Sequence, residues 1–373
     1  NITTLQNIQM SLKIIQEDLT RALSDYRKKY PRLYFLSDNK LIGIFAQMQS
    51  RKLAIVKEVF PGVNSFLVNG DSINGAVLSF DDFILFNTPI NASKPVLEII
   101  KNIEEVMTAS LKLLHFTKPR IDTLPLQLAF LRLMENPNEA FSTETPKGRF
   151  LHLFQKSLTT NGKLKANSVG DKVYIKHEQC SIEYGFQITT ASALFTPSIF
   201  ENVCCFIKEI GDQPLLIQSQ QFSNASSILA QFCFLVGRSI FTLHASQSMD
   251  VLKVSELIDD LLKCNVFTVI DESQLLKTSQ MFEMTLMMKK FFFCAITTNT
   301  IPPLLGINKT AVVIQSISMT EHVNSLSMLY QNQDMSLYTS IVKYLHPLNL
   351  SAIVENQLHQ SDKFSFEFIT HLR

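Results

Sequence analysis

Residues 264–276 read CNVFTVIDESQLL, and the change of character within this stretch decides how the C-terminal half is interpreted. Five mostly apolar residues, 266–270, are followed directly by Asp271 and Glu272. A short apolar run that ends in polar residues is typical of a buried β-strand. Adjacent carboxylates at a strand end can hold magnesium and activate water in a nucleotide-hydrolysing site. The stretch therefore raises the hypothesis of such a site, which the surrounding residues must support.

The sequence from 173 to 317 indicates an α/β module. Near-continuous apolar runs alternate there with helical stretches, which favours a mostly parallel sheet covered by helices on both faces. The runs that we expect to be strands are QPLLIQS, SIFTLHAS, VFTVIDES, FFFCAITTN and TAVVIQS. From 318 to 373 the pattern is helical, and we expect a small helical subdomain.

Residues 1–172 are predicted to be mostly helical. Apolar residues at alternating steps of three and four predict a long first helix that ends before Pro31, with Ser37 or Asp38 as the cap of the next helix. The stripe comprises Leu5, Ile8, Leu12, Ile15, Leu19, Leu23 and Tyr26.

The rest of this part contains short segments and one more long helix. Turn dipeptides at 61–62, 69–70 and 74–75 predict hairpin-like turns over residues 60–91. Residues 94–116 predict a second amphipathic helix, with Val96, Ile99, Ile100, Ile103, Val106 and Met107 on one side. Residues 136–172 contain two polar, loop-like stretches, and we place a domain boundary there.

Composition excludes several classes of function. A net charge of +1 and a charged content of 18% give no reason to expect binding to nucleic acid or to an anionic membrane. The longest apolar window, FFFCAI, is too short to span a bilayer, and the start does not resemble a signal peptide. The six cysteines form no C-x-x-C pair and are interpreted as buried, reduced residues of a cytoplasmic protein. We expect the chain to be a piece of a longer one.

The loop that should bind the phosphates is missing. It should lie between a strand and a helix upstream of Asp271, but residues 215–232, LLIQSQQFSNASSILAQF, contain neither glycine nor lysine. Loss of one lysine–phosphate charge pair amounts to about 4 kcal/mol, or roughly a thousandfold in affinity. Asn299, at the end of the next strand, has two interpretations. It could contact the γ-phosphate of a nucleotide, or it could simply begin a turn. Tight ATP binding is not expected.

Several stretches resemble the dynein heavy chain family. The segment YPRLYFLSDNKLIGIF at 30–45 closely resembles the family's linker, and VKEVFPGV, IEEVMTASLKLL and VYIKHEQCSIEYGF follow in the family's order. Four later stretches, VGRSIFTLHAS, FTVIDESQLL, ITTNT and DKFSFEFITHLR, are similar to parts of its first AAA+ module. The resemblance implies the C-terminal part of a linker at 1–172, an AAA+ large αβ subdomain at 173–317 and a truncated AAA+ small subdomain at 318–373.

The resemblance also implies site residues, all of them vestigial. The family's phosphate loop falls on Ser219, Gln220, Gln221, Phe222, Ser223, Asn224, Ala225 and Ser226. Ala225 then replaces the phosphate-binding lysine, and Ser226 keeps a hydroxyl at the magnesium position. Asp271 and Glu272 match the magnesium-organising acid and the water-activating base, and Asn299 matches the sensor.

We therefore expect a pseudo-ATPase with no catalytic residue, metal or cofactor, serving as a scaffold or interaction surface. The implied partners are the remaining modules of a dynein-like heavy chain, axonemal or dynein-complex proteins and, indirectly, microtubules, in the cytoplasm and the axoneme of a cilium or flagellum. One alternative is a non-hydrolysing module that binds ATP or ADP with magnesium through Ser226, Asp271 and backbone N–H groups. Others are a motor whose later modules hydrolyse ATP, and a helical adaptor with coincidental motifs.

Overall fold

The computed structural model describes most of the chain up to residue 271 and short pieces beyond it. The described residues are 2–45, 52–78, 82–162, 164–190, 197–210, 215–219, 225–271, 275–277, 279–280, 283, 294–298 and 312–314. The predicted small helical subdomain at 318–373 lies outside these residues and stays a prediction.

The N-terminal helices begin and end near the predicted positions. Helix α1 spans Ile2–Lys29 and is followed by a 3₁₀ helix, η1, at Pro31–Phe35. Proline lacks an N–H donor and disfavours the helical conformation of the residue before it, which explains the break. Helices α2, Asp38–Phe45, and α3, Lys52–Glu58, come next.

The first sheet contains the predicted turns, with one correction. Strands β1, Val63–Asn69, β2, Ser72–Leu78, and β3, Phe83–Asn91, are antiparallel in the order β1-β2-β3. The predicted turn at 74–75 is wrong, because Gly75 lies inside β2 and pairs with Leu85. A Cβ at Gly75 would lie 2.3 Å from the carbonyl oxygen of Ile84, so the glycine allows close strand pairing there.

Three α-helices and a short 3₁₀ turn follow the first sheet. Helix α4, Val96–Thr117, packs on β3 and buries most of its predicted apolar side, and a 3₁₀ turn, η4, at Ile121–Thr123 leads into α5, Leu126–Glu135. Helix α6, Pro146–Asn161, begins after Thr145, whose side chain accepts a hydrogen bond from the N–H of Gly148.

The second antiparallel sheet corrects the loop-like interpretation of residues 159–172. Strand β4, Leu164–Val169, pairs with β5, Lys172–His177, which pairs with β6, Cys180–Glu183. Only Leu164 and Ala166 of β4 are buried, and Val169 is exposed, so the apolar alternation is too short for a hydropathy-based interpretation to recognise. The predicted boundary between 172 and 173 falls within this hairpin, and the domain division itself stays a prediction.

The predicted parallel sheet is present. Its strands are β7, Leu215–Ser219, β8, Ile240–His244, β9, Phe267–Asp271, β10, Cys294–Thr298, and β11, Val312–Ile314, in the order β11-β7-β10-β9-β8, with every pair parallel. Helices α7, Pro197–Glu209, α8, Ala225–Leu235, and α9, Val251–Lys263, accompany it.

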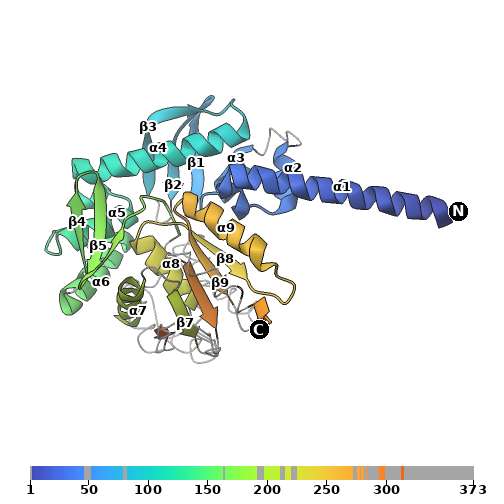
Figure 1. Cartoon of the computed structure of the whole chain (residues 1–373). Helices are drawn as coiled ribbons and strands as arrows, with labels where there is room; N and C mark the ends of the chain where they lie inside the picture. Colours follow the sequence, from blue (N-terminus) through green and yellow to red (C-terminus); the bar gives the residue numbers. More distant parts are fainter. Residues whose placement is uncertain are drawn as a thin grey trace, which may run out of the picture.

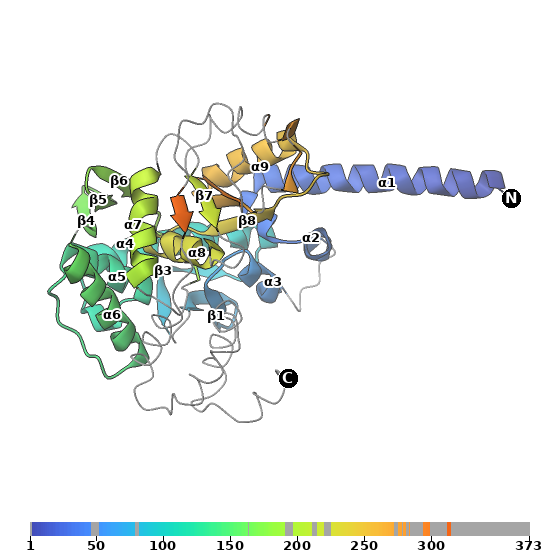
Figure 2. The same ribbon diagram turned by 90° about the horizontal axis from the view of Figure 1, so that it is seen from below.

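Helices cover both faces of this sheet. Alternate strand residues belong to two separate hydrophobic clusters, since Ile217 and Val269 pack with α7 and α8 whereas Leu216 and Ile270 pack with α9. Figure 2 shows α8 and α9 on opposite sides of the strands. The first cluster continues into the N-terminal half, so one core joins the two halves of the described chain.

Most of α1 projects away from the rest of the molecule (Figure 1). Its predicted helix is confirmed, but only the end near η1 is packed. Leu23 is 4% exposed, whereas Leu12 is 60% exposed. The other residues of the stripe are exposed like Leu12. The apolar stripe therefore lacks a partner among the described residues.

All six cysteines are free thiols, but only three are buried as expected, and Cys180 and Cys264 are partly exposed. Cys204, Cys233 and Cys294 are buried, whereas Cys205 is exposed, which corrects the expectation for that residue. Burial raises the pKa of Cys264 to about 11 and that of Cys294 to about 12, so neither is a reactive thiolate. Among the described helices, none is long and apolar enough to cross a membrane.

The two ends of α1 predict a contrast in stability. Leu23→Ala removes a buried side chain and should lower the free energy of unfolding by about 2–5 kcal/mol. Leu12→Ala, at an exposed position of the same stripe, should change it by less than about 0.5 kcal/mol. Urea unfolding of both variants measures the difference, and equal losses would contradict the exposed position of the Leu12 stripe.

Candidate functional site

The predicted catalytic strand ends at the carboxyl edge of the parallel sheet, and Asp271 is its last residue. One carboxylate oxygen, Oδ1, accepts a hydrogen bond from the hydroxyl of Thr297 on β10. The other, Oδ2, lies 3.5 Å from Nδ1 of His244, the last residue of β8. The strand register explains the grouping, because His244 pairs with Asp271, and Ile270 pairs with the residue before Thr297.

The predicted phosphate loop has its ends in the expected places. Ser219 is the last residue of β7, and α8 begins at Ala225 and Ser226, so the loop connects a strand to a helix. Ala225 is 6% exposed and belongs to the large hydrophobic cluster, whereas Ser226 is exposed. Gln220, Gln221, Phe222, Ser223 and Asn224 lie outside the described residues, as do Glu272 and Asn299. The roles of all these residues stay predictions.

The arrangement at the edge leaves Asp271 engaged within the protein. A carboxylate that organises magnesium must offer its oxygens to the ion or to its waters. Here one oxygen accepts from Thr297, which is buried, and the other faces His244, whose side chain is 72% exposed. His244 is the exposed last residue of β8, and no sequence pattern pairs it with Asp271.

A buried polar joint lies where the N-terminal half meets the parallel sheet. Its centre is Arg32 of η1, whose side chain is 4% exposed. The Nε group donates to Oε1 of Glu104 on α4 at 2.8 Å, and Nη1 donates to Oγ of Ser239 at 3.0 Å. The guanidinium carbon also lies 5.5 Å from the ring centre of Phe60, within the range of a cation–π contact. One side chain thus ties η1 to α4 and to the start of β8.

Ser239 and Gln187 extend this joint through the backbone. The N–H of Ser239 donates to Oε1 of Gln187 at 3.0 Å, and its hydroxyl donates to the carbonyl of Ile188 at 3.3 Å. The side-chain amide nitrogen of Gln187, Nε2, donates to the backbone carbonyl of Cys264. Nε2 of Gln127 on α5 donates to the backbone carbonyl of Gln187 at 2.8 Å. Buried polar groups without partners are costly, so these bonds select one position for the segment that enters the sheet.

The turn between α8 and β8 interlocks with the residues after β6. Gly237 has φ +66°, and a Cβ there would lie 2.5 Å from the ring of Tyr184, so both the conformation and the contact require glycine. Arg238 donates to the carbonyl of Glu183 at 3.1 Å and to Oδ1 of Asn265 at 3.2 Å. Desolvation lowers the pKa of the Arg238 guanidinium, consistent with its partial burial in this joint.

Contacts of η1 with α9 and β8 complete the joint. The hydroxyl of Tyr34 donates to Oδ2 of Asp260 at 3.2 Å, and the ring of Phe35 meets that of Phe241 edge to face at 5.4 Å. Burial, followed by the charge of Asp260, raises the pKa of Tyr34 to about 12, so the phenol remains a donor. The segments at 30–45, 173–186 and 236–246, which carry the sequence resemblance, therefore meet at one place.

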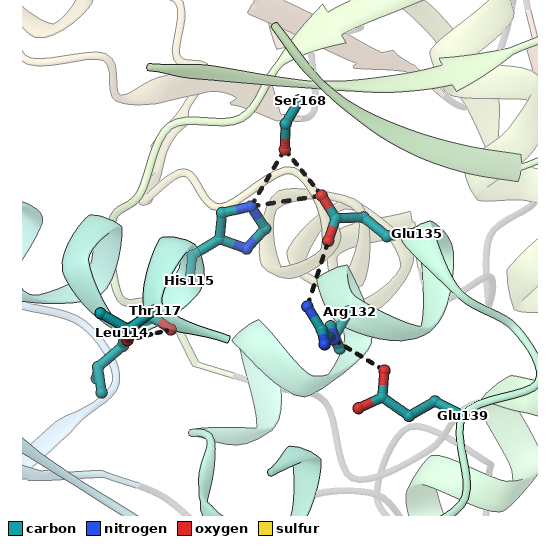
Figure 3. A network of polar contacts seen from close by, with 7 residues as sticks. All are labelled: Leu114, His115, Thr117, Arg132, Glu135, Glu139 and Ser168. Carbon is teal, nitrogen blue, oxygen red and sulfur yellow. Dashed lines mark hydrogen bonds and ion pairs between the residues drawn. The ribbon is translucent and has the colours of Figure 1, made fainter. Parts of the chain in front are cut away.

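A second polar network connects α4, α5 and β4 (Figure 3). Nε2 of His115 lies 3.4 Å from Oε1 of Glu135 and 3.4 Å from Oγ of Ser168, and this hydroxyl donates to Oε1 of Glu135 at 2.8 Å. Arg132 approaches the other oxygen of Glu135 at 3.9 Å and donates to Glu139 at 2.8 Å.

This network contains the residue types of a hydrolase triad without its geometry. A triad places the serine and the carboxylate on different nitrogens of the imidazole, so that the ring can take a proton from the hydroxyl. Here Ser168 and Glu135 both contact Nε2, and the hydroxyl donates to the carboxylate instead. The His115 side chain is also only 2% exposed. The network holds secondary-structure elements together and is not arranged for acyl transfer.

Sequence reasoning did not identify Arg32, Glu104, Gln187 or Ser239 as a cluster. The only available signal was the position of Arg32 within the segment that resembles the dynein linker. Its partner Ser239 lies 207 residues away in the chain, so no local pattern could connect the two.

Breaking the joint should destabilise the protein. Arg32→Met keeps the apolar stem but leaves the partly buried Glu104 and the fully buried Ser239 without this donor. The loss should cost about 2–4 kcal/mol. Lys40→Met, which breaks the exposed pair with Glu58, should cost less than about 1 kcal/mol. Denaturant unfolding compares the two, and similar losses would show that the joint does not depend on Arg32.

The second network predicts a pH dependence. Burial alone raises the pKa of Glu135, but hydrogen bonds from His115 and Ser168 outweigh it, so its pKa is lower than usual. A lowered folded-state pKa stabilises the protein above the unfolded value of about 4.3, and this contribution is lost as pH falls through the folded-state pKa.

The stability difference between wild type and Glu135→Gln should therefore be constant above about pH 5 and shrink below about pH 4. Glu144→Gln, at an exposed position, should show no such change. Thermal unfolding of wild type and both variants, at pH values on either side of this range, measures these differences. A stability difference between wild type and Glu135→Gln that grows in acid would contradict the prediction.

Comparison with known proteins connects the N-terminal part to one family. No curated protein matches the chain. Residues 2–117, less than half of the chain, match the family model described as dynein heavy chain, N-terminal region 2. This range contains α1, η1, the first sheet and α4, including Arg32 and Glu104 of the joint. The match supports a relation between this chain and the dynein heavy chain family.

Proposed function

We propose that the chain is a non-catalytic, dynein-heavy-chain-like segment. In this proposal, the α/β region is a degenerate AAA+ module without ATPase activity, and the linker-like half is a structural scaffold or interaction surface. Its partners are other dynein components, among them the remaining modules of a dynein-like heavy chain, and its place is the cytoplasm, in a ciliary or flagellar assembly. The relation to the dynein family supports this setting.

The observation that carries the proposal is the position of Ala225. This residue stands where the resemblance places the phosphate-binding lysine, and its methyl group is buried in the hydrophobic cluster. A P-loop site adds a lysine at this position to neutralise the phosphates, beyond what the N–H groups of the helix start supply. The engagement of Asp271 by Thr297 and His244 adds support, because each carboxylate oxygen already has a neighbour within the protein.

The joint supports the scaffold part of the proposal. Buried hydrogen bonds and a shared hydrophobic cluster connect the linker-like half to the parallel sheet. A lever that swings against its module needs a contact that can break at low cost, whereas these buried polar groups would lose their partners. The geometry therefore favours a fixed connection at this place.

One alternative has its own supporting observation. Ser226 is exposed at the beginning of α8, where the helix dipole and free N–H groups favour an anion. Together with Asp271, it could support nucleotide binding without hydrolysis. A motor whose later modules hydrolyse ATP is the other alternative, and intact phosphate loops downstream of this chain would favour it.

Nucleotide binding separates the proposal from the first alternative. Titration of the chain with fluorescent ATP and magnesium should show no binding at micromolar concentration, because no lysine neutralises the phosphates. Asp271→Asn and the exposed control Asp259→Asn should leave this result unchanged. Micromolar, magnesium-dependent binding that Asp271→Asn weakens, and Asp259→Asn does not, would overturn the pseudo-ATPase proposal.

A further inference from the structure

The outer face of the β4–β6 sheet has an unusual distribution of charge. Leu164, Ala166, Val173, Ile175 and Ile182 face inward and are buried. The alternating residues face outward and form cross-strand rows, which are Lys165–Lys176–Ser181, Asn167–Tyr174–Glu183 and Val169–Lys172. Figure 1 shows β4 and β5 at the side of the molecule opposite the projecting end of α1.

Two lysines stand directly opposite each other in the first row. Lys165 on β4 pairs in register with Lys176 on β5. Like charges at directly opposed positions destabilise an antiparallel pair, since their side chains project side by side from the same face. Neither ammonium group forms an ion pair with another residue in the described parts of the chain.

Two glutamates of this sheet and its turn form ion pairs with lysines other than Lys165 and Lys176. Glu183 accepts a hydrogen bond from Lys172 at 3.0 Å, which raises the pKa of that lysine. Glu178, in the turn between β5 and β6, lies 3.9 Å from Lys208 on α7. Asp171, in the turn before β5, contributes weakly to the raised pKa of the adjacent Lys172. The positive charge of Lys165 and Lys176 is therefore uncompensated within the sheet.

We propose that this face, centred on Lys165 and Lys176, binds an acidic segment of a partner protein. Two carboxylates of that segment neutralise the opposed lysines, and an apolar side chain covers Tyr174 and the exposed Val169 beside them. The surface deepens the proposed scaffold function and rests on its interaction-surface part. It does not depend on whether the parallel sheet binds nucleotide.

The charge pattern favours a peptide over nucleic acid or lipid. A protein that binds a phosphate backbone strongly neutralises several phosphates, and recognition of anionic lipid uses clusters of about 4–8 basic residues. This face offers two uncompensated lysines, and Glu183 in the adjacent row would repel a continuous line of phosphates. Paired carboxylates next to apolar side chains match both the charges and the surface between them.

Lys165→Glu tests the proposal, because it should change stability and binding in opposite directions. The new carboxylate would face Lys176, so the melting temperature of the full chain should rise. The affinity of the variant for a fluorescein-labelled peptide of alternating glutamate and valine, measured by fluorescence anisotropy, should fall at least about fivefold. Lys57→Glu, an exposed control with the same change in net charge, should alter the affinity less than about twofold.

Three results would overturn the inference. One is the absence of any peptide binding to the natural chain at low salt. A second is an equal loss of affinity in Lys57→Glu, which would indicate attraction by net charge alone. The third is tighter binding of a single-stranded oligonucleotide of equal charge that Lys165→Glu also weakens, since this would indicate a nucleic-acid surface. Magnesium–ATP binding, measured on the same samples, shows separately whether the pseudo-ATPase proposal fails.

Discussion

The buried guanidinium group of Arg32 is the interaction on which the arrangement of the described chain depends. It donates to Glu104 and to Ser239, and thereby connects η1 to α4 and to the start of β8. A charge removed from water is tolerated only where partners surround it, so the three elements must come together in one way. The backbone bonds of Ser239 and Gln187 extend this requirement to the segment that follows β6.

This joint also explains why the segments that resemble the dynein family lie where they do. Residues 30–45 supply the arginine and the aromatic rings, residues 173–186 lead into the segment of Gln187, and residues 236–246 supply Gly237, Arg238 and Ser239. Their resemblance therefore concerns the connection between two halves of the molecule as much as a catalytic site. The family match over residues 2–117 includes one side of that connection.

The carboxyl edge of the parallel sheet contrasts with the joint. At the joint, each charged group meets partners from other elements, whereas the described residues of the edge place one acid, Asp271, beside Thr297 and His244. Ala225 contributes to the hydrophobic cluster, and Asp271 faces Thr297 and His244. The resulting chemistry is that of a packed strand end, which agrees with the proposed role as a scaffold. The opposed lysines on the second sheet then provide a surface on which such a scaffold could meet a partner.

The sequence by itself determined the elements whose periodicity is long or whose residues are strongly apolar. The helices at 2–29 and 96–117 and the parallel strands follow from apolar spacing, because burial of one face or both faces imposes that spacing. The sequence also shows that residues 215–232 contain neither lysine nor glycine, and the consequence for nucleotide binding stays a prediction. Short strands with few buried residues, such as β4, escaped recognition. Gly75 was mistaken for a turn residue because strand pairing, rather than local conformation, requires it. Only the tertiary structure decided that Arg32 meets Ser239, that Asp271 meets Thr297 and His244, and that Lys165 opposes Lys176. These contacts join residues from different elements, so their energies depend on how the chain folds back on itself and not on any local pattern.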